Sequence, residues 1–383
     1  MAVLGSLIEQ VRGVSYKPED LHTTLNENSI TLLRANNIKD GQLNFDDVVY
    51  VDKKKVSDKQ LLKAGDILIC ASSGSKELVG KAAYVECNLP MTFGAFCKVV
   101  RPKTDCPQYM GHFFNSPYYR ERIANSAAGA NINNIRNEHI DVLEIAWPSV
   151  EGQRSAVAVL DKVSELIALR KEQLAKLDQL VKSRFIELFG DQETNPFGWT
   201  QCTIGECCTL KSGTSLSAEV ENEGGPIPYV KVGDMNYPGN ERYITTSSRY
   251  VSEATAGKGI FEVGSILFPK RGGAIGTNKK RMTKLPICAD LNVMGVSSNG
   301  KLLPEYLLAY FDMIDLGALS DGSSVPQINN KNIAPLVICV PPIELQKQFA
   351  AFVEEIDKSK LAIQQSLDKL ELLKKSLMQE YFG

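Results

Sequence analysis

The chain has 383 residues, of which 43% are apolar and 23% are charged, and its formal net charge is −2 at pH 7. This length predicts two or three domains, and the apolar content is that of ordinary globular cores. The near-neutral charge excludes a basic signature over the whole chain, so a nucleic-acid site would have to be a local patch. No apolar run reaches about 18 residues, and Met1–Gln10 lacks the charged start and apolar run of a signal peptide, so we predict no membrane span.

The cysteines give no sign of a metal or disulfide site. Nine are present, an odd number, and only three histidines accompany them. Cys202, Cys207 and Cys208 cluster in the sequence, but the chain has no CxxC pair. We therefore predict reduced thiols in a cytoplasmic protein, without zinc.

Residues 1–149 alternate short apolar runs with turn signals, which is typical of a small α+β domain with a curved sheet. The pattern predicts strands over 30–34, 47–51, 65–70, 82–85 and 96–100, a helix over 107–125, an Asn-rich loop over 129–137 and a closing strand over 139–148.

The stretch 150–190 predicts one long helix. Apolar residues recur at spacings of three, four and seven, and no Pro or Gly interrupts them after Gly152. Gly190 ends the pattern and Pro196 follows, as expected beyond a helix C-terminus. The apolar stripe is narrow, which favours packing against another helix, and the chain offers one at 343–383.

Between the two helices, residues 191–342 read as a second α+β domain. The predicted elements are strands over 227–232 and 264–268, a helix over 304–316, an Asn-containing loop over 322–331 and a closing strand over 333–341.

The second half of the chain repeats the first. Residues 129–190 align without a gap with 322–383, and the identities include Gly129/Gly322, Asn137/Asn330, Pro148/Pro341, Gln153/Gln346, Leu180/Leu373 and Phe189/Phe382. Two antiparallel helices of equal length would relate the two globules by an approximate two-fold axis. The divergence is concentrated in the globules, which favours a scaffold that binds two unlike targets, or two unlike halves of one target.

Motifs of catalysis are absent from the sequence. It contains no GxxxxGK[ST] loop, no GxSxG elbow and no HExxH pair. Asn195-Pro196-Phe197 is similar to the Asn-Pro-Pro-aromatic motif of base-amino methyltransferases, but the second Pro is missing, and we favour a turn. We therefore predict no catalytic residue and no cofactor bound by this chain.

One stretch carries a local charge signal. Residues 264–284 contain basic residues and interleaved glycines but no acidic residue. Cations release counterions from a polyanion and glycines allow close backbone approach, so we predict DNA contact there, against the alternative of a solvated basic hairpin. The candidates are Lys270, Arg271, Lys279, Lys280 and Arg281, with weaker first-half equivalents at Lys53, Lys54, Lys55, Ser73 and Lys76.

Polar residues also follow two matching strands. Amide side chains can read adenine, and Arg or Lys can read guanine. The candidate base readers are Arg34, Asn36 and Asn37 after 30–34, and Lys231, Asp234 and Asn236 after 227–232. The alternative is that the Asn residues only form turns.

Taken together, these features resemble the specificity (S) subunits of type I restriction–modification systems, over the whole chain. The carriers are the two repeats of a globule followed by a long helix and the segment 199–213. The local marks are Gly65-Asp66-Ile67-Leu68, Gly264-Ser265-Ile266-Leu267, Pro148 and Gln153, Pro341-Pro342-Ile343-Glu344-Leu345-Gln346, Phe189-Gly190 and Phe382-Gly383.

The resemblance implies an α+β fold with two similar target-recognition domains, 1–149 and 191–342. Two long antiparallel helices, 150–190 and 343–383, would form a coiled-coil spacer with pseudo-two-fold symmetry. Each domain would bind one half of a split double-stranded DNA site through the major groove. The chain would recruit two methyltransferase (M) subunits that use S-adenosylmethionine, and restriction (R) subunits that use ATP with Mg.

Two departures and three alternatives remain. The first globule begins at Val3-Leu4-Gly5 without the longer lead seen at 195–204, and the Gly13/Gly213 match is modest. Base-reading residues vary within the family, so none is carried over. The alternatives are a recognition subunit paired with one partner that carries both cleavage and methylation, a nuclease with an unrecognised acidic site, and a dimeric scaffold without a DNA role.

Overall fold

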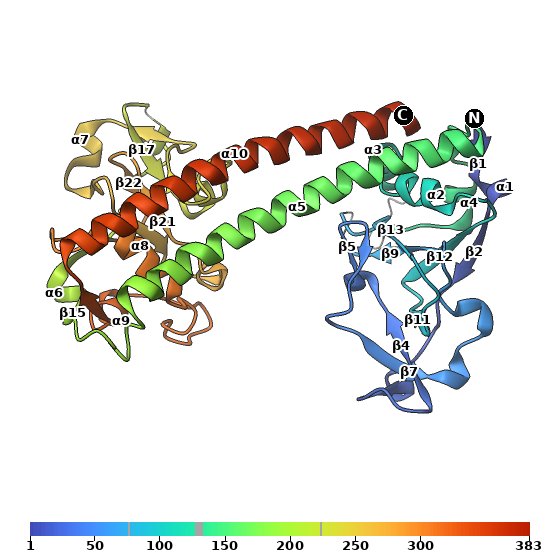
Figure 1. Ribbon diagram of the computed structural model, residues 1–383, viewed down its shortest axis with the longest axis horizontal. Helices are drawn as coiled ribbons and strands as arrows, with labels where there is room; N and C mark the ends of the chain where they lie inside the picture. Colours follow the sequence, from blue (N-terminus) through green and yellow to red (C-terminus); the bar gives the residue numbers. More distant parts are fainter. Residues whose placement is uncertain (76, 127–132, 223) are drawn as a thin grey trace. The chain divides into compact units, whose positions relative to one another are not determined.

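The computed structural model describes residues 1–75, 77–126, 133–222 and 224–383. The chain forms two compact units (Figure 1). Unit 1 comprises Met1–Lys171 and Gln365–Gly383, and unit 2 comprises Glu172–Gln364. Within the described ranges, no helix combines the length and apolar character needed to cross a membrane.

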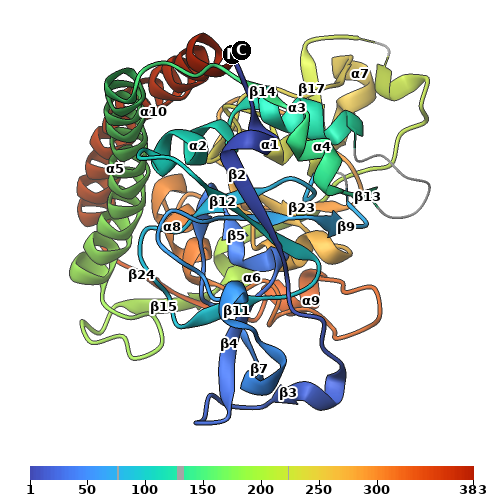
Figure 2. The same cartoon turned by 90° about the vertical axis from the view of Figure 1, so that its right-hand side faces the viewer.

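Unit 1 is built on two four-stranded sheets, in the orders β10-β8-β12-β2 and β11-β4-β7-β3, with β11 parallel to β4. Its strands are β1 Ala2–Val3, β2 Ile8–Arg12, β3 Leu21–His22, β4 Ser29–Leu33, β5 Ile38–Lys39, β6 Gln42–Leu43, β7 Val49–Asp52, β8 Ile67–Cys70, β9 Ser72–Ser73, β10 Ala82–Tyr84, β11 Met91–Phe93, β12 Cys97–Pro102, β13 Asn133–Asn134 and β14 Glu144–Ile145. Its short helices are α1 Leu4–Leu7, α2 Pro107–Phe113, α3 Pro117–Ser126 and α4 Asn137–Asp141. Figure 2 faces this unit and shows both chain ends close to β14.

Unit 2 repeats this plan with sheets in the orders β16-β23-β20-β21-β18 and β19-β17-β22, and again the pair β17 and β22 is parallel. Its strands are β15 Thr200–Thr203, β16 Cys208–Ser212, β17 Ile227–Val230, β18 Tyr243–Ile244, β19 Tyr250–Val251, β20 Ile266–Pro269, β21 Arg281–Thr283, β22 Cys288–Ala289, β23 Val293–Ser298 and β24 Val337–Val340. Its short helices are α6 Ile204–Cys207, α7 Glu253–Ala256, α8 Pro304–Met313 and α9 Asn330–Ile333.

Two helices of 40 residues each, α5 Val150–Phe189 and α10 Ile343–Phe382, contribute to both units. In unit 2 the rings of Phe185 and Phe349 lie 5.5 Å apart, and Asp178 bonds to Lys360, so the two helix segments run in opposite directions. In unit 1 Leu160 shares a core cluster with Met378, and Lys171 Nζ lies 3.1 Å from Glu371 Oε1, with the same antiparallel sense. In each unit the segments of α5 and α10 therefore contact one another, as the apolar stripe of the sequence predicts.

The end of each long helix packs on an aromatic residue of a globule. Phe189 at the end of α5 lies 4.7 Å from the Tyr306 ring in unit 2, and Phe382 at the end of α10 lies 5.0 Å from the Tyr109 ring in unit 1. The Tyr306 hydroxyl donates to Cys339 O at 2.8 Å, and the Tyr109 hydroxyl donates to Ala146 O at 2.9 Å. The repeat therefore extends to individual contacts in the two cores.

Glycines fix the same turn before the central strand of each unit. Gly65 and Gly264 have φ of +88° and +86°, a region that glycine adopts at little cost. A Cβ at Gly264 would lie 2.6 Å from Pro304 Cγ, and one at Gly65 would lie 3.2 Å from Pro107. The matching glycines Gly65 and Gly264 thus reflect a shared packing constraint between the turn and the following helix.

Four predicted elements differ from the structure. The helix over 107–125 is two helices, because the proline ring at Pro117 disfavours a helical Ser116 and begins α3 instead. The closing strands over 139–148 and 333–341 each begin with a helical turn, α4 or α9, and only β14 and β24 are extended. In the predicted loop 129–137, residues 129–132 lie outside the described part of the chain, and β13 pairs with β9.

Candidate nucleic-acid interface

The turns after β4 and β17 are built alike. The Arg34 N–H donates to Asn37 Oδ1 at 2.7 Å, and the Lys231 N–H donates to Asp234 Oδ2 at 2.7 Å. Each bond caps a 3₁₀ turn, Ala35–Asn37 or Val232–Asn236. A basic residue therefore begins the same capped turn in both units.

Asn37 and Asp234 belong to the fold and are not presented to a ligand. Their exposed fractions are 0% and 3%. The Asn37 amide donates to Asn44 O and Asp47 O, and Asp234 Oδ1 accepts from Ser248. Their prediction as base readers fails on this geometry, because their polar atoms already have partners inside the protein.

The other predicted residues of these turns remain at the surface with partners from their own unit. Arg34 and Asn36 both bond to the Asp47 carboxylate, at 2.9 and 2.7 Å. Lys231 Nζ lies 2.6 Å from Glu221 Oε2. Asn236 accepts a hydrogen bond from Lys279, which brings the turn after β17 against the basic stretch.

A second pair of loops follows the central strands β8 and β20. Two residues beyond β8, Ser72 pairs with Asn134, and two residues beyond β20, Arg271 pairs with Gln327. Ser73 is half-buried at the end of this pairing, whereas the Arg271 side chain is exposed. Lys76 lies outside the described residues.

The basic stretch of unit 2 does not form one patch. Lys280 is only 5% exposed, and its ammonium group donates to Ile314 O at 2.6 Å and to Asn278 Oδ1 at 2.8 Å. Lys270 bonds to Ser212 Oγ at 2.9 Å, and burial lowers its pKa. Arg281 lines a groove beside the long helices. Arg271 and Lys279 therefore remain as the cations on the side of the predicted loop.

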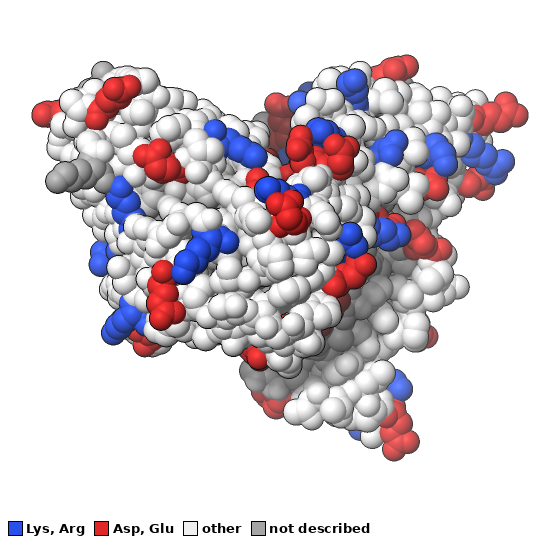
Figure 3. Space-filling view, turned by 60° about the vertical axis from the view of Figure 1, so that its left-hand side comes forward, with Lys and Arg blue, Asp and Glu red and all other residues white. Residues whose placement is uncertain are grey.

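Lys53, Lys54 and Lys55 form an exposed 3₁₀ turn after β7. Lys53 donates to Glu27 O at 2.7 Å, and Lys55 lies 3.0 Å from Asp20 Oδ1. Pairing with Asp20 raises the pKa of Lys55. The Asp20 carboxylate thus offsets part of the charge of this turn. The surface seen in Figure 3 likewise mixes acidic and basic side chains and has no continuous basic field.

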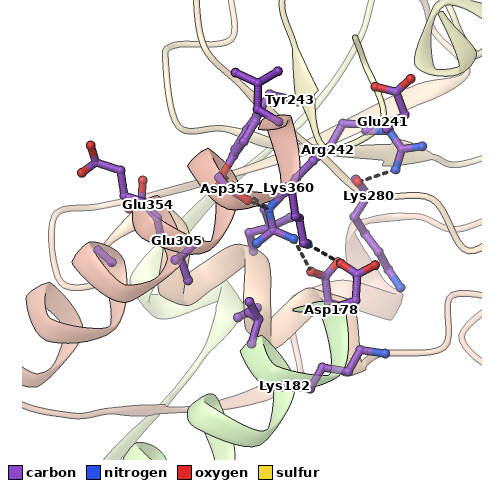
Figure 4. A pocket seen from close by; sticks show the side chains of 18 of the residues that line it. Asp178, Lys182, Glu241, Arg242, Tyr243, Lys280, Glu305, Glu354, Asp357 and Lys360 are labelled. Carbon is purple, nitrogen blue, oxygen red and sulfur yellow. Dashed lines mark hydrogen bonds and ion pairs between the residues drawn. The ribbon is translucent and has the colours of Figure 1, made fainter. Parts of the chain in front are cut away.

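Unit 2 also contains a groove of about 1150 Å³ that the sequence did not reveal (Figure 4). In it, the Tyr243 hydroxyl donates to Asp357 of α10, and Arg242 Nη1 lies 3.7 Å from Asp312 Oδ2 of α8. Burial raises the pKa of Asp312. These residues are far apart in sequence, so no local pattern announces them, and together they hold the globule of unit 2 on its own segment of α10.

Unit 1 has a smaller groove of about 740 Å³ in the corresponding place. There His112 Nε2 of α2 lies 2.7 Å from Asp161 Oδ1 of α5. Burial lowers the pKa of His112, while the Asp161 carboxylate opposes that shift. The polar side-chain contacts between globule and helix in these two grooves therefore differ, although the aromatic contacts at the helix ends are alike.

The described residues contain no group of three or more His, Cys, Asp or Glu side chains placed to hold a metal ion. The clustered thiols of Cys207 and Cys208 are buried, and burial raises the pKa of each to about 11. A raised pKa leaves the thiol rather than the reactive thiolate at neutral pH.

Comparison with known proteins places this geometry in a class of DNA-recognition proteins. A model of the type I restriction modification DNA specificity domain matches residues 15–179 and again 196–373, one match for each half of the chain. The chain belongs to this family: it is a specificity subunit of the type I restriction–modification kind.

Individual relatives agree. The specificity subunit of the type I restriction enzyme StySPI from Salmonella potsdam is 32% identical over an alignment of 265 residues that covers 65% of this chain and 57% of that protein. The match therefore spans less than two thirds of that relative. The EcoKI specificity subunit of Escherichia coli strain K12 is 26% identical over 414 aligned residues, covering 100% of this chain and 88% of the relative.

Solved structures support the fold. The S subunit of a type I system from M. genitalium has a TM-score of 0.55 and 17% identity, and the match covers 100% of this chain and 95% of that one. A chain from a study of complex assembly in the type I system gives a TM-score of 0.56 at 17% identity, covering 99% of this chain and 96% of that one.

The burial of Lys280 should make the free energy of unfolding depend on pH. Burial lowers its pKa from 10.5 to about 8, so between these values the unfolded chain binds more protons than the folded one. Stability therefore rises with pH across this window. Lys280→Met should reduce that rise by up to about 1.4 kcal/mol per pH unit, measured by urea unfolding at several pH values.

The matched control is Lys347→Met, which removes an exposed lysine from α10. Equal slopes for the two variants would show that Lys280 titrates like a surface lysine.

Proposed function

We propose that this chain is the sequence-specific recognition subunit of a type I restriction–modification complex, in which each globule binds one half of a bipartite DNA site. The observation that carries the proposal is the duplication itself. Both units keep two main sheets, one of which holds a parallel pair, the same capped turn and the same paired loop after the central strand, while the side chains on those turns differ. A shared scaffold with unlike recognition turns suits a DNA sequence with two unlike halves.

In this proposal the DNA is held jointly with partner subunits. The near-neutral charge of the chain, and the mixed charges on the face shown in Figure 3, would give it little general affinity for a polyanion. Two methyltransferase subunits with S-adenosylmethionine, and restriction subunits with ATP and Mg, would supply the chemistry in the cytoplasm. This chain would bind none of these cofactors.

The exposed apolar residues of the long helices support a docking role. Leu180 and Leu373 occupy the same position of the repeat, and both are 46% exposed. Val150 and Ile343 are another such pair, at 37% and 41%. Half-exposed leucines in equivalent places favour two copies of one partner, each covering one site.

The continuous helices support a spacer role. Each has 40 residues with no break, and each takes part in both units. A continuous helix resists compression, so the length between the two recognition domains would set the gap between the half-sites.

The decisive experiment is to express the chain with its methyltransferase subunits and sequence adenine methylation in the host. A methylated, split and asymmetric sequence is the expected result. DNA cleavage by the purified chain with a divalent metal would favour the nuclease alternative. A partner that carries both cleavage and methylation would favour the fused system, and absence of salt-dependent DNA binding would favour a scaffold.

Arg271 and Lys279 should contact phosphates. Replacing each with Ala in the assembled complex should weaken DNA binding and reduce the slope of log K against log salt by about 0.9 for each phosphate that is no longer neutralised. Fluorescence anisotropy over a salt series measures both quantities. Lys301→Ala removes another exposed lysine of unit 2 as the control, and slopes that agree for all the proteins would remove this loop from the DNA interface.

Leu180→Asp and Leu373→Asp should impair partner docking, because each places a charge in a proposed apolar contact. Native mass spectrometry should find one methyltransferase subunit on each single variant and none on the double variant. Gln365→Asp, an exposed polar position of α10, is the control. Full occupancy of the double variant would place docking elsewhere.

Removal of seven residues from each helix, 171–177 and 363–369, keeps two whole turns in register. The helices shorten by about 10 Å, so the gap between half-sites should shrink by about three base pairs while both half-sites stay the same. Methylation sequencing reads the result. An unchanged gap, or altered half-sites, would contradict the spacer.

A further inference from the structure

Glycine occupies the same place in the loops that follow the two central strands. Gly74 lies four residues beyond the end of β8, and Gly273 lies four residues beyond the end of β20. Midway between strand and glycine, Ser72 pairs with Asn134 in unit 1 and Arg271 pairs with Gln327 in unit 2. The loops otherwise differ in sequence, so the shared glycine requires a reason.

The fold itself gives no such reason. Neither Gly74 nor Gly273 has a positive φ, and a Cβ at either position would meet nothing within 4 Å. By contrast, Gly272 has φ of +74°, and a Cβ at Gly213 would lie 2.1 Å from Asp290 O. Glycine without a structural need loses conformational entropy on folding, so Ala would serve the isolated protein at least as well.

The same two properties single out few positions in the molecule. Among the glycines that the structure describes, only those that combine an ordinary φ with open space at the Cβ qualify: Gly74, Gly233, Gly273 and Gly276. Gly233 lies in the capped turn after β17, and Gly276 lies in the 3₁₀ turn Gly273–Thr277. All four therefore fall in turns that the sequence predicts as DNA-contacting, and three of them, Gly74, Gly273 and Gly276, lie in the loops after β8 and β20.

The charge beside these glycines suits an anion. Arg271 is exposed next to the loop of unit 2, and residues 264–284 include no acidic side chain. The nearest carboxylate in the paired loop, Asp321, accepts hydrogen bonds from Ser323 and from the Gln327 N–H. Those bonds orient the Asp321 carboxylate towards its own loop.

We infer that Gly74, Gly273 and Gly276 are the points where the sugar–phosphate backbone of DNA approaches the main chain. A side chain there would hold the DNA away, whereas glycine lets peptide N–H groups come within hydrogen-bonding distance of phosphate oxygens. The inference rests on the proposed DNA-recognition function and names the surface within it. Contacts to the sugar–phosphate backbone fix the position of the protein along the DNA and do not read its bases. Such contacts can therefore be the same in both units even though the two half-sites differ.

The test uses the chain assembled with its methyltransferase subunits and a duplex that carries the methylated site of the host. Gly74→Ala, Gly273→Ala and Gly276→Ala should each keep the Tm of the wild type or raise it, and each should weaken DNA binding by about tenfold. Gly317→Ala is the matched control, because Gly317 is exposed outside these loops and its Cβ would meet only the tip of the Asp315 side chain. Its binding should not change.

Each other result is decisive. Wild-type affinity in the three variants would overturn the close approach while leaving DNA recognition intact. A lower Tm in any of them would show that the fold does need that glycine, and would remove the premise. A wild-type complex that fails to bind the duplex would instead refute the proposed function.

Discussion

The structure depends on the packing of each long-helix end into an aromatic core. Phe189 is buried against Tyr306 and Phe349, and Phe382 is buried against Tyr109 and Phe113. Burying one phenylalanine side chain contributes about 1.5–3 kcal/mol, and well-oriented aromatic pairs add about 0.5–1.5 kcal/mol each. The consequence is topological: the helix that follows the first globule completes the core of unit 2, and the helix that follows the second globule completes the core of unit 1.

This exchange explains which parts of the chain remain alike. A glutamine at the first turn of each long helix donates to the carbonyl of the preceding Pro148 or Pro341, at 3.0 and 2.9 Å. Gln346 Oε1 also accepts from the Leu303 N–H, whereas the Cys106 N–H that precedes α2 uses Thr104. The helix starts are thus fixed by short-range bonds and the helix ends by aromatic packing, while the turns after β4, β8, β17 and β20 differ between the units. The residues that fix the scaffold are therefore the same in both units, and the residues that differ lie in the turns.

The sequence predicted the features that repeat along the chain. Apolar spacing located both long helices to within one residue, because Gly190 and Gly383 follow the last helical position. The gap-free repeat identified the architecture before any single motif did. The failures lie where distant segments decide the outcome. The broken helix at Pro117 was locally readable, but the helical turn at α4 owes its position to packing against α1, where a Cβ at Gly5 would lie 3.0 Å from Asp141.

The predicted site divides along the same line. Asn37 and Asp234 stand three residues after a strand-ending cation, a spacing that serves capping as well as recognition, and burial shows that capping uses them. Lys280 reads as one more cation in a basic stretch, yet it bonds to a carbonyl contributed from 34 residues away. A charged residue in the sequence therefore supports a recognition role only where its side chain is exposed and is not engaged within the fold. Glycine carries the complementary information, because a glycine that the fold does not need indicates something outside the chain. On this reasoning the loops after β8 and β20 are defined as much by their missing side chains as by Arg271.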